Sequence, residues 1–267
     1  MGGEPLYLLL LKLPSIVADL VTAYLLYRLA RNKIPGNWPM IIAIIYVFNP
    51  AVFINSAIWG QVDSFLVMFL ALGFILLNSG KPELSGLPLA AAILIKPQGL
   101  ILLPVVFYEF VLKKDRRVFI KTLIIGLLSC IIIILPFALN NEPSWIFKLY
   151  LGTAEGYQYA SLNAFNFFSL IGANLTPDSE TFLFFDYQVW GYFFIIAMLV
   201  YTAVLHWKGR GVHLTYMNAL VLSMGVFMLS IRMHERYMFP VLFFLAVIFI
   251  LTRDKRSLLF FGIASFT

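Results

Sequence analysis

The sequence predicts an all-α, polytopic bundle of transmembrane helices that forms a single domain over residues 1–267. The chain is 61% hydrophobic and only 12% charged, and its mean hydropathy is +0.91. Soluble domains carry about 25% charged residues. The apolar runs are continuous and lack the alternation of barrel strands, and only helices or closed barrels satisfy their backbone in lipid. We therefore expect a helical integral membrane protein.

Apolar segments of about 17 to 25 residues mark the expected spanning helices. Lys12 and Pro14 interrupt the first apolar run, and no signal-peptide pattern opens the chain. In chain order, we expect spans at Leu13–Ala30, Trp38–Ile58, Ser64–Leu77, Val118–Leu139, Val189–Trp207, Leu214–Ile231 and Met238–Leu251, with another beginning at Ser257.

The segment Leu84–Phe110 is expected to form a hairpin of two short helices. It has the length of one span, but basic residues flank both of its ends, and a single crossing would place one group outside. A turn at Lys96-Pro97-Gln98-Gly99 returns the chain to the cytoplasm. Proline suits this break because it cannot donate the helical hydrogen bond.

The basic residues then separate by side, because cytoplasmic loops carry an excess of Lys and Arg. Of the 19 basic residues, the following are expected on the cytoplasmic side: Arg28, Arg31, Lys33, Lys81, Lys113, Lys114, Arg116, Arg117, Lys121, Lys208, Arg210, Arg253, Lys255 and Arg256. The others lie on or toward the opposite face, beside Asp63 and His234: Lys12, Lys96, Lys148, Arg232 and Arg236. The net charge of +6 is explained by cytoplasmic loops, and no nucleic-acid partner is expected.

One long extracytoplasmic loop is expected, at about Asn140 to Gln188. It is rich in aromatic residues and contains Ser161-Leu-Asn-Ala-Phe-Asn166. Loops of this length are usually functional or disordered, and the aromatic content argues against disorder. Two interpretations are open and compatible: a crevice for a sugar ring or lipid headgroup, and an amphipathic helix lying at the membrane interface.

The segment Arg232-Met-His-Glu-Arg-Tyr237 places five polar side chains between two apolar runs. Polar groups at such a position are costly and mark a functional site, although Arg and Tyr could also serve as interfacial anchors. Arg232, Arg236 and Lys96 suit a phosphate. His234 could donate to a phosphate oxygen or transfer a proton. Glu235 is expected to orient one of the arginines.

Asp63 is expected to handle an incoming hydroxyl group, with Gln61 beside it as donor and acceptor. Structural alternatives stay open: Lys96 could snorkel, Asp63 could cap the helix that starts at Ser64, and Asp19 could pair with Lys12 or another cation. Cys130 is the single cysteine, so an intrachain disulfide is excluded. No chemical role is expected for His206 or His213. Motifs for zinc proteolysis, ATP hydrolysis and serine hydrolysis do not occur in the sequence.

An ordered set of motifs resembles the GT-C superfamily of membrane glycosyltransferases, especially bacterial relatives of the GPI-anchor mannosyltransferases. The motifs run through nearly the whole chain: Lys12-Leu-Pro-Ser-Ile-Val-Ala-Asp19, Asn49-Pro50, Trp59-Gly-Gln-Val-Asp63, Lys96-Pro-Gln98, Ser161-Leu-Asn-Ala-Phe-Asn166 and Met233-His-Glu-Arg-Tyr237. The resemblance implies a GT-C-like fold and transfer of a hexose, expected to be mannose, from a polyprenyl-phosphate donor, with inversion.

The resemblance also implies roles for individual residues. Asp63 and His234 would be catalytic, and Lys96, Arg232 and Arg236 would bind the donor phosphate. The substrate-binding residues would be Gln61, Gln98, Asn163, Asn166, Glu235 and Tyr237. No cofactor or metal ligand is implied, with a divalent metal left open. The expected partners are the polyprenyl-phosphate sugar, membrane lipid, and a glycan, lipid or protein acceptor. The active site would face outward from a prokaryotic plasma membrane.

The chain departs from this family at its start. The family's main catalytic acid follows a first transmembrane helix, and both normally precede the Lys-Leu-Pro-Ser segment. Here Met1–Leu11 precede it, with Glu4 as the one acid, so we expect an N-terminally truncated fragment. Two other function classes stay open: a transporter or flippase, to which broken helices also belong, and a non-catalytic subunit that binds a lipid phosphate.

Overall fold

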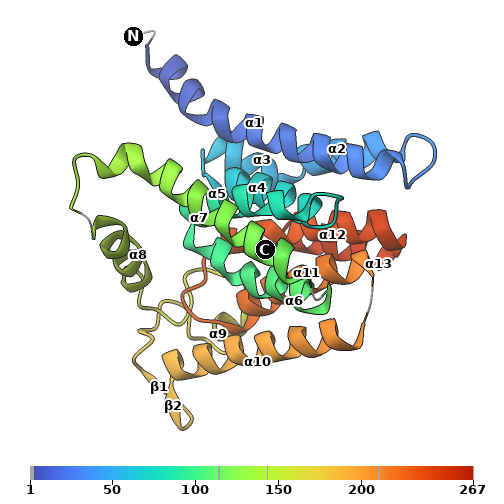
Figure 1. Ribbon diagram of the computed structural model, residues 1–267. Coiled ribbons are helices and arrows are strands. Elements are labelled where there is room, and N and C mark those ends of the chain that lie inside the picture. The colour runs from blue at the N-terminus through green and yellow to red at the C-terminus, as the bar shows by residue number, and fades with distance from the viewer. Residues whose placement is uncertain (1–2, 114, 143, 210, 267) are drawn as a thin grey trace.

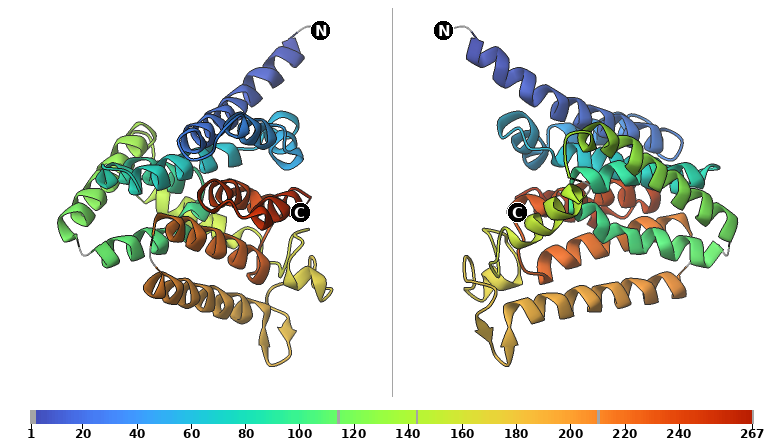
Figure 2. Two further views of the ribbon diagram at one scale, coloured as in Figure 1. Left: turned by 90° about the vertical axis from the view of Figure 1, so that its right-hand side faces the viewer. Right: turned by 60° about the vertical axis from the view of Figure 1, so that its left-hand side comes forward.

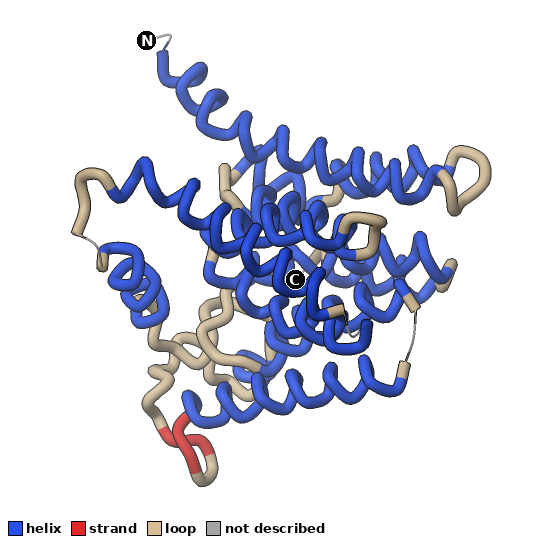
Figure 3. The backbone as a smooth tube through the Cα atoms, viewed as in Figure 1, coloured by secondary structure: helices blue, strands red, loops and turns tan. Residues whose placement is uncertain are grey.

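The computed structural model describes residues 3–113, 115–142, 144–209 and 211–266. The regular secondary structure of this part of the chain is helical apart from one β-hairpin, and loops connect the elements (Figure 3). The hairpin pairs β1 (Thr181–Phe182) with β2 (Phe185–Asp186). The helices are α1 (Gly3–Arg31), α2 (Trp38–Val47), α3 (Pro50–Phe53), α4 (Asp63–Leu77), α5 (Gly86–Ile95), α6 (Leu103–Lys113), α7 (Arg116–Ala138), α8 (Trp145–Glu155), α9 (Phe167–Leu170), α10 (Tyr187–Lys208), α11 (Val212–Leu229), α12 (Phe239–Thr252) and α13 (Lys255–Ala264).

Five helices of the described chain are long and apolar enough to cross a membrane, and a bent pair makes a sixth candidate span. The five comprise α1, α7, α10, α11 and the segment Glu235–Thr252, which contains α12. Shorter apolar helices fill the space between them, including α4 and α5. The expected all-α polytopic bundle is confirmed, and the chain is a multi-pass membrane protein.

The two ends of the bundle carry different elements (Figures 1 and 2). The α1–α2, α4–α5 and α12–α13 connections lie at one end, at the right of Figure 1, whereas α8, α9 and the β-hairpin lie at the other. Arg253 donates to the backbone oxygen of Lys33, which ties two of the basic connections together. Lys114 and Arg210, both expected on this side, lie outside the described residues. We call the end with the basic connections the basic end. Helices α8 and α9 and the β-hairpin lie at the opposite end of the bundle.

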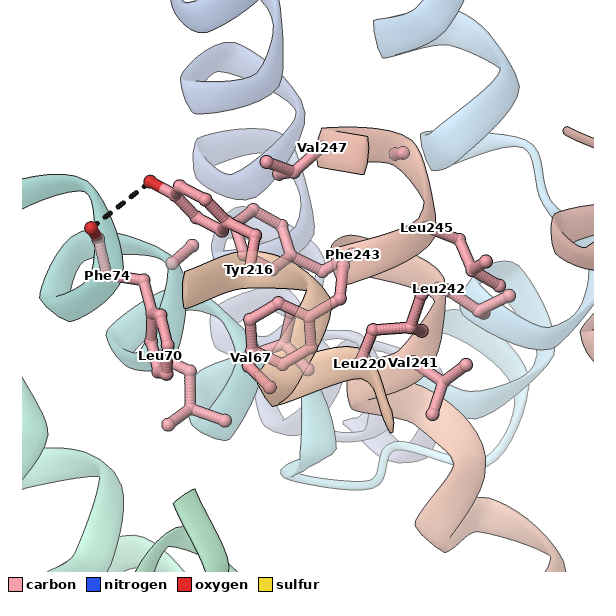
Figure 4. Close-up of a cluster of buried hydrophobic side chains, with 14 of the residues drawn as sticks. Val67, Leu70, Phe74, Tyr216, Leu220, Val241, Leu242, Phe243, Leu245 and Val247 are labelled. Atoms are coloured by element: carbon pink, nitrogen blue, oxygen red, sulfur yellow. Dashed lines mark hydrogen bonds between the residues drawn. The ribbon is translucent and has the colours of Figure 1, made fainter. Parts of the chain in front are cut away.

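Helix α12 forms the centre of the protein and is not a lipid-facing span. Of the segment Glu235–Thr252, which contains α12, 72% is buried inside the protein. The corresponding share is 11% for the most apolar part of α7. A helix that is apolar all round needs apolar surroundings on every side, which here are α4, α11 and α13. Phe244 meets Phe74 edge-on with ring centroids 5.2 Å apart, and the Tyr216 hydroxyl donates to the Phe74 carbonyl oxygen at 3.1 Å (Figure 4). The α4–α11–α12 core fixes the positions of the segments that carry the site.

Two of the expected spans have different boundaries. The first begins near Gly3 and not at Leu13, because Pro14 is accommodated inside α1. Proline removes one hydrogen bond, and the apolar residues around it keep the helix in place by burial in lipid. The expected single span Trp38–Ile58 is bent by 46°. Asn49 causes the break: its side chain accepts from the Ala51 backbone N–H at 2.9 Å and starts α3 anew, with Pro50 as first residue.

The expected hairpin between Leu84 and Phe110 is confirmed. A Cβ atom on Gly86, at the start of α5, would lie 2.2 Å from the Thr122 carbonyl oxygen of α7. Phe110, near the end of α6, packs against Phe119 of α7 with ring centroids 5.6 Å apart. Both ends of the segment therefore lie beside the first turns of α7, and the chain turns back between them.

The expected long loop is only partly a loop. Within Asn140 to Gln188 the structure forms helices α8 and α9 and the β-hairpin. Helix α8 exposes Phe147 and Leu151, which fits the interpretation of an interfacial helix. Tyr150 on its inner side donates to the Ile93 carbonyl oxygen at 2.7 Å, so α8 is docked onto the end of α5.

Replacing Gly86 with alanine should separate α5 from α7 and lower the stability of the bundle. Gly86 has backbone atoms of Thr122 and Gly126 where a side chain would be, and these cannot move aside as a flexible side chain could. We expect a loss of about 1 to 3 kcal/mol, the usual cost of overpacking. Thermal unfolding in detergent measures it. Gly80→Ala is the matched control because no atom lies within 4 Å of its Cβ position, and an equal loss in both variants would contradict this account.

Candidate active site

The polar residues of the site come from three breaks between helices. Asp63 is the first residue of α4, and Lys96 separates α5 from the 3-10 segment η3 (Pro97–Leu102). His234 precedes the 3-10 segment η4 (Glu235–Met238), which joins α11 to α12. Helix breaks at membrane depth are tolerated where they are buried in protein or line a watery cavity. We use the term polar cluster for Asp63, Lys96, Gln98, His234, Arg236 and Tyr237.

Lys96 and Asp63 form the central ion pair of the cluster. The Lys96 ammonium group lies 2.5 Å from Asp63 Oδ1, and their side chains are 14% and 2% exposed. Two structural alternatives are thereby wrong: Lys96 does not snorkel to water, and Asp63 does not cap a helix beginning at Ser64, since α4 begins at Asp63 itself. The pair joins the two short helices α4 and α5 at the site.

Tyr237 lies between the cations and the histidine. The Lys96 ammonium group and the Arg236 guanidinium group are each 5.9 Å from the centre of its ring. The His234 ring meets the Tyr237 ring at 5.2 Å and the Tyr157 ring at 5.0 Å, both edge-on. Aromatic faces attract cations, so the Tyr237 ring stabilises both positive side chains beside it.

Four buried polar atoms of the cluster have no hydrogen-bond partner within the described part of the chain: Asp63 Oδ2, Gln98 Oε1, His234 Nε2 and Arg236 Nε. Leaving such a group unpaired costs about 1 to 3 kcal/mol each. Folded proteins therefore seldom bury several together without a functional reason. Their gathering in one cluster marks it as the place where a polar ligand binds.

Two grooves border the cluster. One, of about 390 Å³, is bordered by Arg236 and Glu235 and is otherwise mainly apolar, with Trp59, Phe239 and Leu242 among its lining residues. The other, of about 300 Å³, is aromatic, and its lining includes Gln98, Tyr150, Tyr157, Arg232 and Tyr237. The polar cluster thus separates an apolar groove from an aromatic one.

Burial lowers the pKa of His234 below its usual value, and the positive charges of Arg236 and Lys96 lower it further. The carboxylates of Glu235 and Asp63 act in the opposite direction. Because its usual pKa is about 6.5, the ring is neutral at pH 7. His234 is therefore in the form that accepts a proton.

Arg232 is held by Asp178, a partner that the sequence interpretation missed. Its Nε atom lies 2.6 Å from Asp178 Oδ2, and Asp178 is buried. The backbone N–H of Arg232 donates to the Tyr159 carbonyl oxygen at 3.0 Å, and the φ of +60° at Arg232 lies in the left-handed region. Arg232 therefore connects the end of α11 to the segment before α10, with the Asp178 carboxylate as its partner there.

Asn163 and Asn166 also have structural partners. Asn163 exchanges hydrogen bonds with Asn174, through its backbone N–H at 2.8 Å and its side-chain oxygen at 3.0 Å. Asn166 is buried, accepts from the Ser169 backbone N–H and donates to the Ser230 carbonyl oxygen. The structure gives Asn166 the role of a helix cap that anchors the end of α11.

The remaining expected residues lie around the cluster. Gln61 is half-buried in the turn before Asp63, and its backbone N–H donates to the Asn55 carbonyl oxygen at 2.9 Å. Gly60 in the same turn has φ +72°, and Lys12 packs against it while donating to the Ile58 carbonyl oxygen at 2.7 Å. The structural alternative in which Asp19 pairs with Lys12 is thus wrong. Both oxygens of Asp19 are buried without a hydrogen-bond partner among the described residues.

Removing the carboxylate of Asp178 should loosen the aromatic groove without changing the polar cluster. Asp178→Asn removes the buried carboxylate that holds Arg232 Nε at 2.6 Å, and we expect a loss of about 1 to 3 kcal/mol. Thermal unfolding measures it. Asp254→Asn is the control because its arginine partner is exposed at the basic end. Unchanged stability of Asp178→Asn would contradict a structural role for Arg232.

These features define a polytopic membrane protein with a buried acid, base and cation cluster between two grooves at one end of its bundle. The sequence profile described as glycosyltransferase family 87 matches residues 4–231. No curated protein sequence gives a significant match. The match covers most of the chain. It includes Asp63, Lys96 and Gln98 of the polar cluster and ends before His234, Arg236 and Tyr237. The chain belongs to glycosyltransferase family 87, a membrane family of the GT-C type.

Proposed function

We propose that the chain transfers a hexose, mannose, from a polyprenyl-phosphate donor to an acceptor at the extracytoplasmic face of a prokaryotic plasma membrane, with inversion at the anomeric carbon. The observation that carries the proposal is the polar cluster, in which two cations and four unpaired buried polar atoms lie between two grooves. Family membership supports the reaction class, and the separation of the cluster from the basic end supports the outward orientation.

The donor phosphate is placed on Arg236 and Lys96. Arg236 borders the apolar groove and has an unpaired Nε, and the Lys96 ammonium group lies 5.9 Å from the centre of the Tyr237 ring that Arg236 also contacts. Arginine binds phosphate through its planar fork and lysine as a point charge. Arg232 is a weaker choice than the sequence implies, because Asp178 already balances its charge.

The two grooves have lining residues that suit different parts of the reactants. Trp59, Phe239 and Leu242 offer an apolar path for the polyprenyl chain, directly beside Arg236. The aromatic groove offers ring faces together with the amide of Gln98, a combination that suits a sugar ring. Donor lipid and glycan would then approach the cluster from opposite sides.

His234 is the proposed proton acceptor. As the acceptor oxygen attacks the anomeric carbon, the bond from that carbon to the phosphate oxygen breaks, and polyprenyl phosphate leaves with its charge on the cations. The hydroxyl proton passes to the neutral His234 ring, whose Nε2 has no protein partner. Asp63 holds the Lys96 ammonium group in place, and its free Oδ2 can orient the attacking hydroxyl group. No resident cofactor is assigned to this step.

Transfer of label tests the proposal. Membranes containing the chain and radiolabelled polyprenyl-phosphate mannose should transfer mannose, and Arg236→Ala should lower the rate about 100-fold, as loss of one group that stabilises developing charge does. Arg256→Ala is the matched control, because this arginine is 81% exposed at the basic end. A chain that moves the labelled lipid between leaflets without transfer would be a flippase, and this outcome, like full activity of Arg236→Ala, would overturn the proposal.

A further inference from the structure

The β1–β2 hairpin ends in a turn of unusual composition. Phe182 pairs with Phe185, so Leu183 and Phe184 form the two-residue turn between them. Their side chains are 69% and 83% exposed. Two-residue hairpin turns in water favour Gly, Asn and Asp. This turn instead presents two large apolar side chains to its surroundings.

The backbone of the turn is strained for the residue that it contains. Leu183 has φ +60°, in the left-handed region that suits glycine and costs other residues free energy. Contacts within the protein do not compensate, because both turn side chains point away from it. An apolar environment outside the protein would compensate for the strain and cover the exposed surface.

The hairpin is rigidly attached to the start of α10. The Trp190 indole N–H donates to the Phe182 carbonyl oxygen at 2.9 Å. The Phe182 ring stacks on Tyr187 with centroids 5.5 Å apart, and Phe185 packs edge-on against Trp190 at 5.8 Å. The turn therefore has a fixed position relative to a membrane-spanning helix.

That position is beside the lipid-facing surface of the bundle. Only 17% of the apolar window of α10 is buried inside the protein, and Val189, Phe193 and Ile196 are exposed along it. In Figures 1 and 2 the hairpin extends past α10 on the side away from the rest of the bundle. Tyr187 and Trp190 at this end of α10 are the residue types that gather at membrane interfaces. The apolar turn is thus continuous with a surface that lipid already covers.

We propose that the β1–β2 hairpin is a membrane anchor that inserts Leu183 and Phe184 into the lipid interface beside α10. Its base is polar, with the Thr181 hydroxyl donating to Asp186 at 3.3 Å, and its tip is apolar. This polarity matches the change from headgroups to acyl chains. The partner is the lipid surface, and the role is to hold the segment between α8 and α10 at a fixed depth.

Fluorescence quenching in vesicles tests the proposal. In a Cys130→Ser background, Phe184→Cys carries an environment-sensitive fluorophore, and the full chain is reconstituted into phosphatidylcholine vesicles with or without shallow spin-labelled lipid. We expect severalfold quenching by the spin-labelled lipid and little by aqueous iodide. Ser179→Cys is the matched control, because it is exposed in the same polar segment and should show the reverse.

Leu183→Cys provides the same measurement if Phe184→Cys fails to fold. Quenching of both turn positions by iodide would place the turn in water and overturn the anchor. Protection from both quenchers would indicate cover by a second copy or another protein, and would overturn it equally.

Discussion

Replacing Lys96 with methionine is expected to lower both the stability of the chain and its affinity for a lipid phosphate. Methionine has a similar length and no charge, so the packing of the α5–η3 break is largely retained. Asp63, which is 2% exposed, would then keep a buried negative charge with no cation beside it. Breaking a buried pair in this way costs about 3 to 5 kcal/mol. Thermal unfolding in detergent should show this loss.

The double variant Asp63→Asn, Lys96→Met separates the two effects. It removes both charges and keeps the shapes of the side chains, and neutral replacement of a buried pair is often without penalty. We expect near wild-type stability and a rate of mannose transfer still lowered about 100-fold, because the phosphate has lost a cation. A double variant that regains transfer as well as stability would show that the pair is purely structural.

Lys148→Met is the matched control for the single variant. Lys148 pairs with Glu142 near α8, but both side chains are about two-thirds exposed, at 67% and 70%. Exposed pairs contribute about 0 to 1 kcal/mol, so the control should unfold close to the wild type. An equal loss in Lys96→Met and Lys148→Met would contradict the importance of burial at the cluster.

The sequence was sufficient to predict part of the polar cluster. Three polar interruptions of apolar segments were visible in the sequence: Asp63, Lys96 beside Pro97, and the run Arg232–Tyr237. In the structure they lie at the same end of the bundle, at breaks between helices. The prediction succeeded because polar groups inside hydrocarbon are costly, so each interruption needs a cause. The basic connections lie at the opposite end, in line with the tendency of Lys and Arg to gather in the loops on one side of a membrane.

Pairings between distant residues could not be predicted in the same way. Arg232 and Asp178 are far apart in the chain, and Asp178 lies in a segment with no periodicity that would place it. The amide of Asn166 is of a type that binds sugars. Its role as a helix cap depends on the positions of Ser169 and Ser230, which the sequence does not give. Hydropathy likewise could not show that α12 is central and α7 peripheral, because lipid and protein interior are equally apolar.

The polar cluster and the proposed anchor lie at the same end of the bundle and have different tasks. Tyr157, which packs on His234, belongs to the same chain segment that ends at the β-hairpin. Leu162 donates its backbone N–H to the Met233 carbonyl oxygen at 3.0 Å, so this segment also holds the η4 break directly. Fixing the depth of the hairpin would therefore fix the depth at which the cluster meets a lipid phosphate.

Mannose transfer is expected to fall as the pH is lowered, with an apparent pKa below the ordinary histidine value of about 6.5. Burial, Arg236 and Lys96 depress the pKa of His234, so the neutral ring persists to lower pH than in a free histidine. Below that pKa the ring carries a proton and cannot accept another from the acceptor hydroxyl. The rate should therefore be constant at neutral pH and be lost on the acid side. Initial rates measured between pH 4.5 and 8 would show this loss of activity on the acid side, the acid limb of the pH profile.

Substitution of His234 should remove this dependence together with most of the activity. His234→Gln keeps a polar side chain of similar size and should lower the rate about 100-fold or more, the usual contribution of a general base. The residual activity should show no acid limb with this pKa. His213→Gln is the control, because His213 lies at the basic end, in the first turn of α11. An acid limb that persists unchanged in His234→Gln would assign the proton to another group, for which Asp63 is the next candidate.

The charge of Arg236 provides an independent readout of the same histidine. The chain contains three histidines, so the ring resonance of His234 can be assigned by its loss in His234→Gln. Removing the positive charge in Arg236→Gln should raise the pKa of His234 toward its ordinary value, because Arg236 is the largest depressing charge. Arg256→Gln, at the far end of the bundle, should leave it unchanged. Equal titration of His234 in both variants would contradict the effect of the Arg236 charge on this ring.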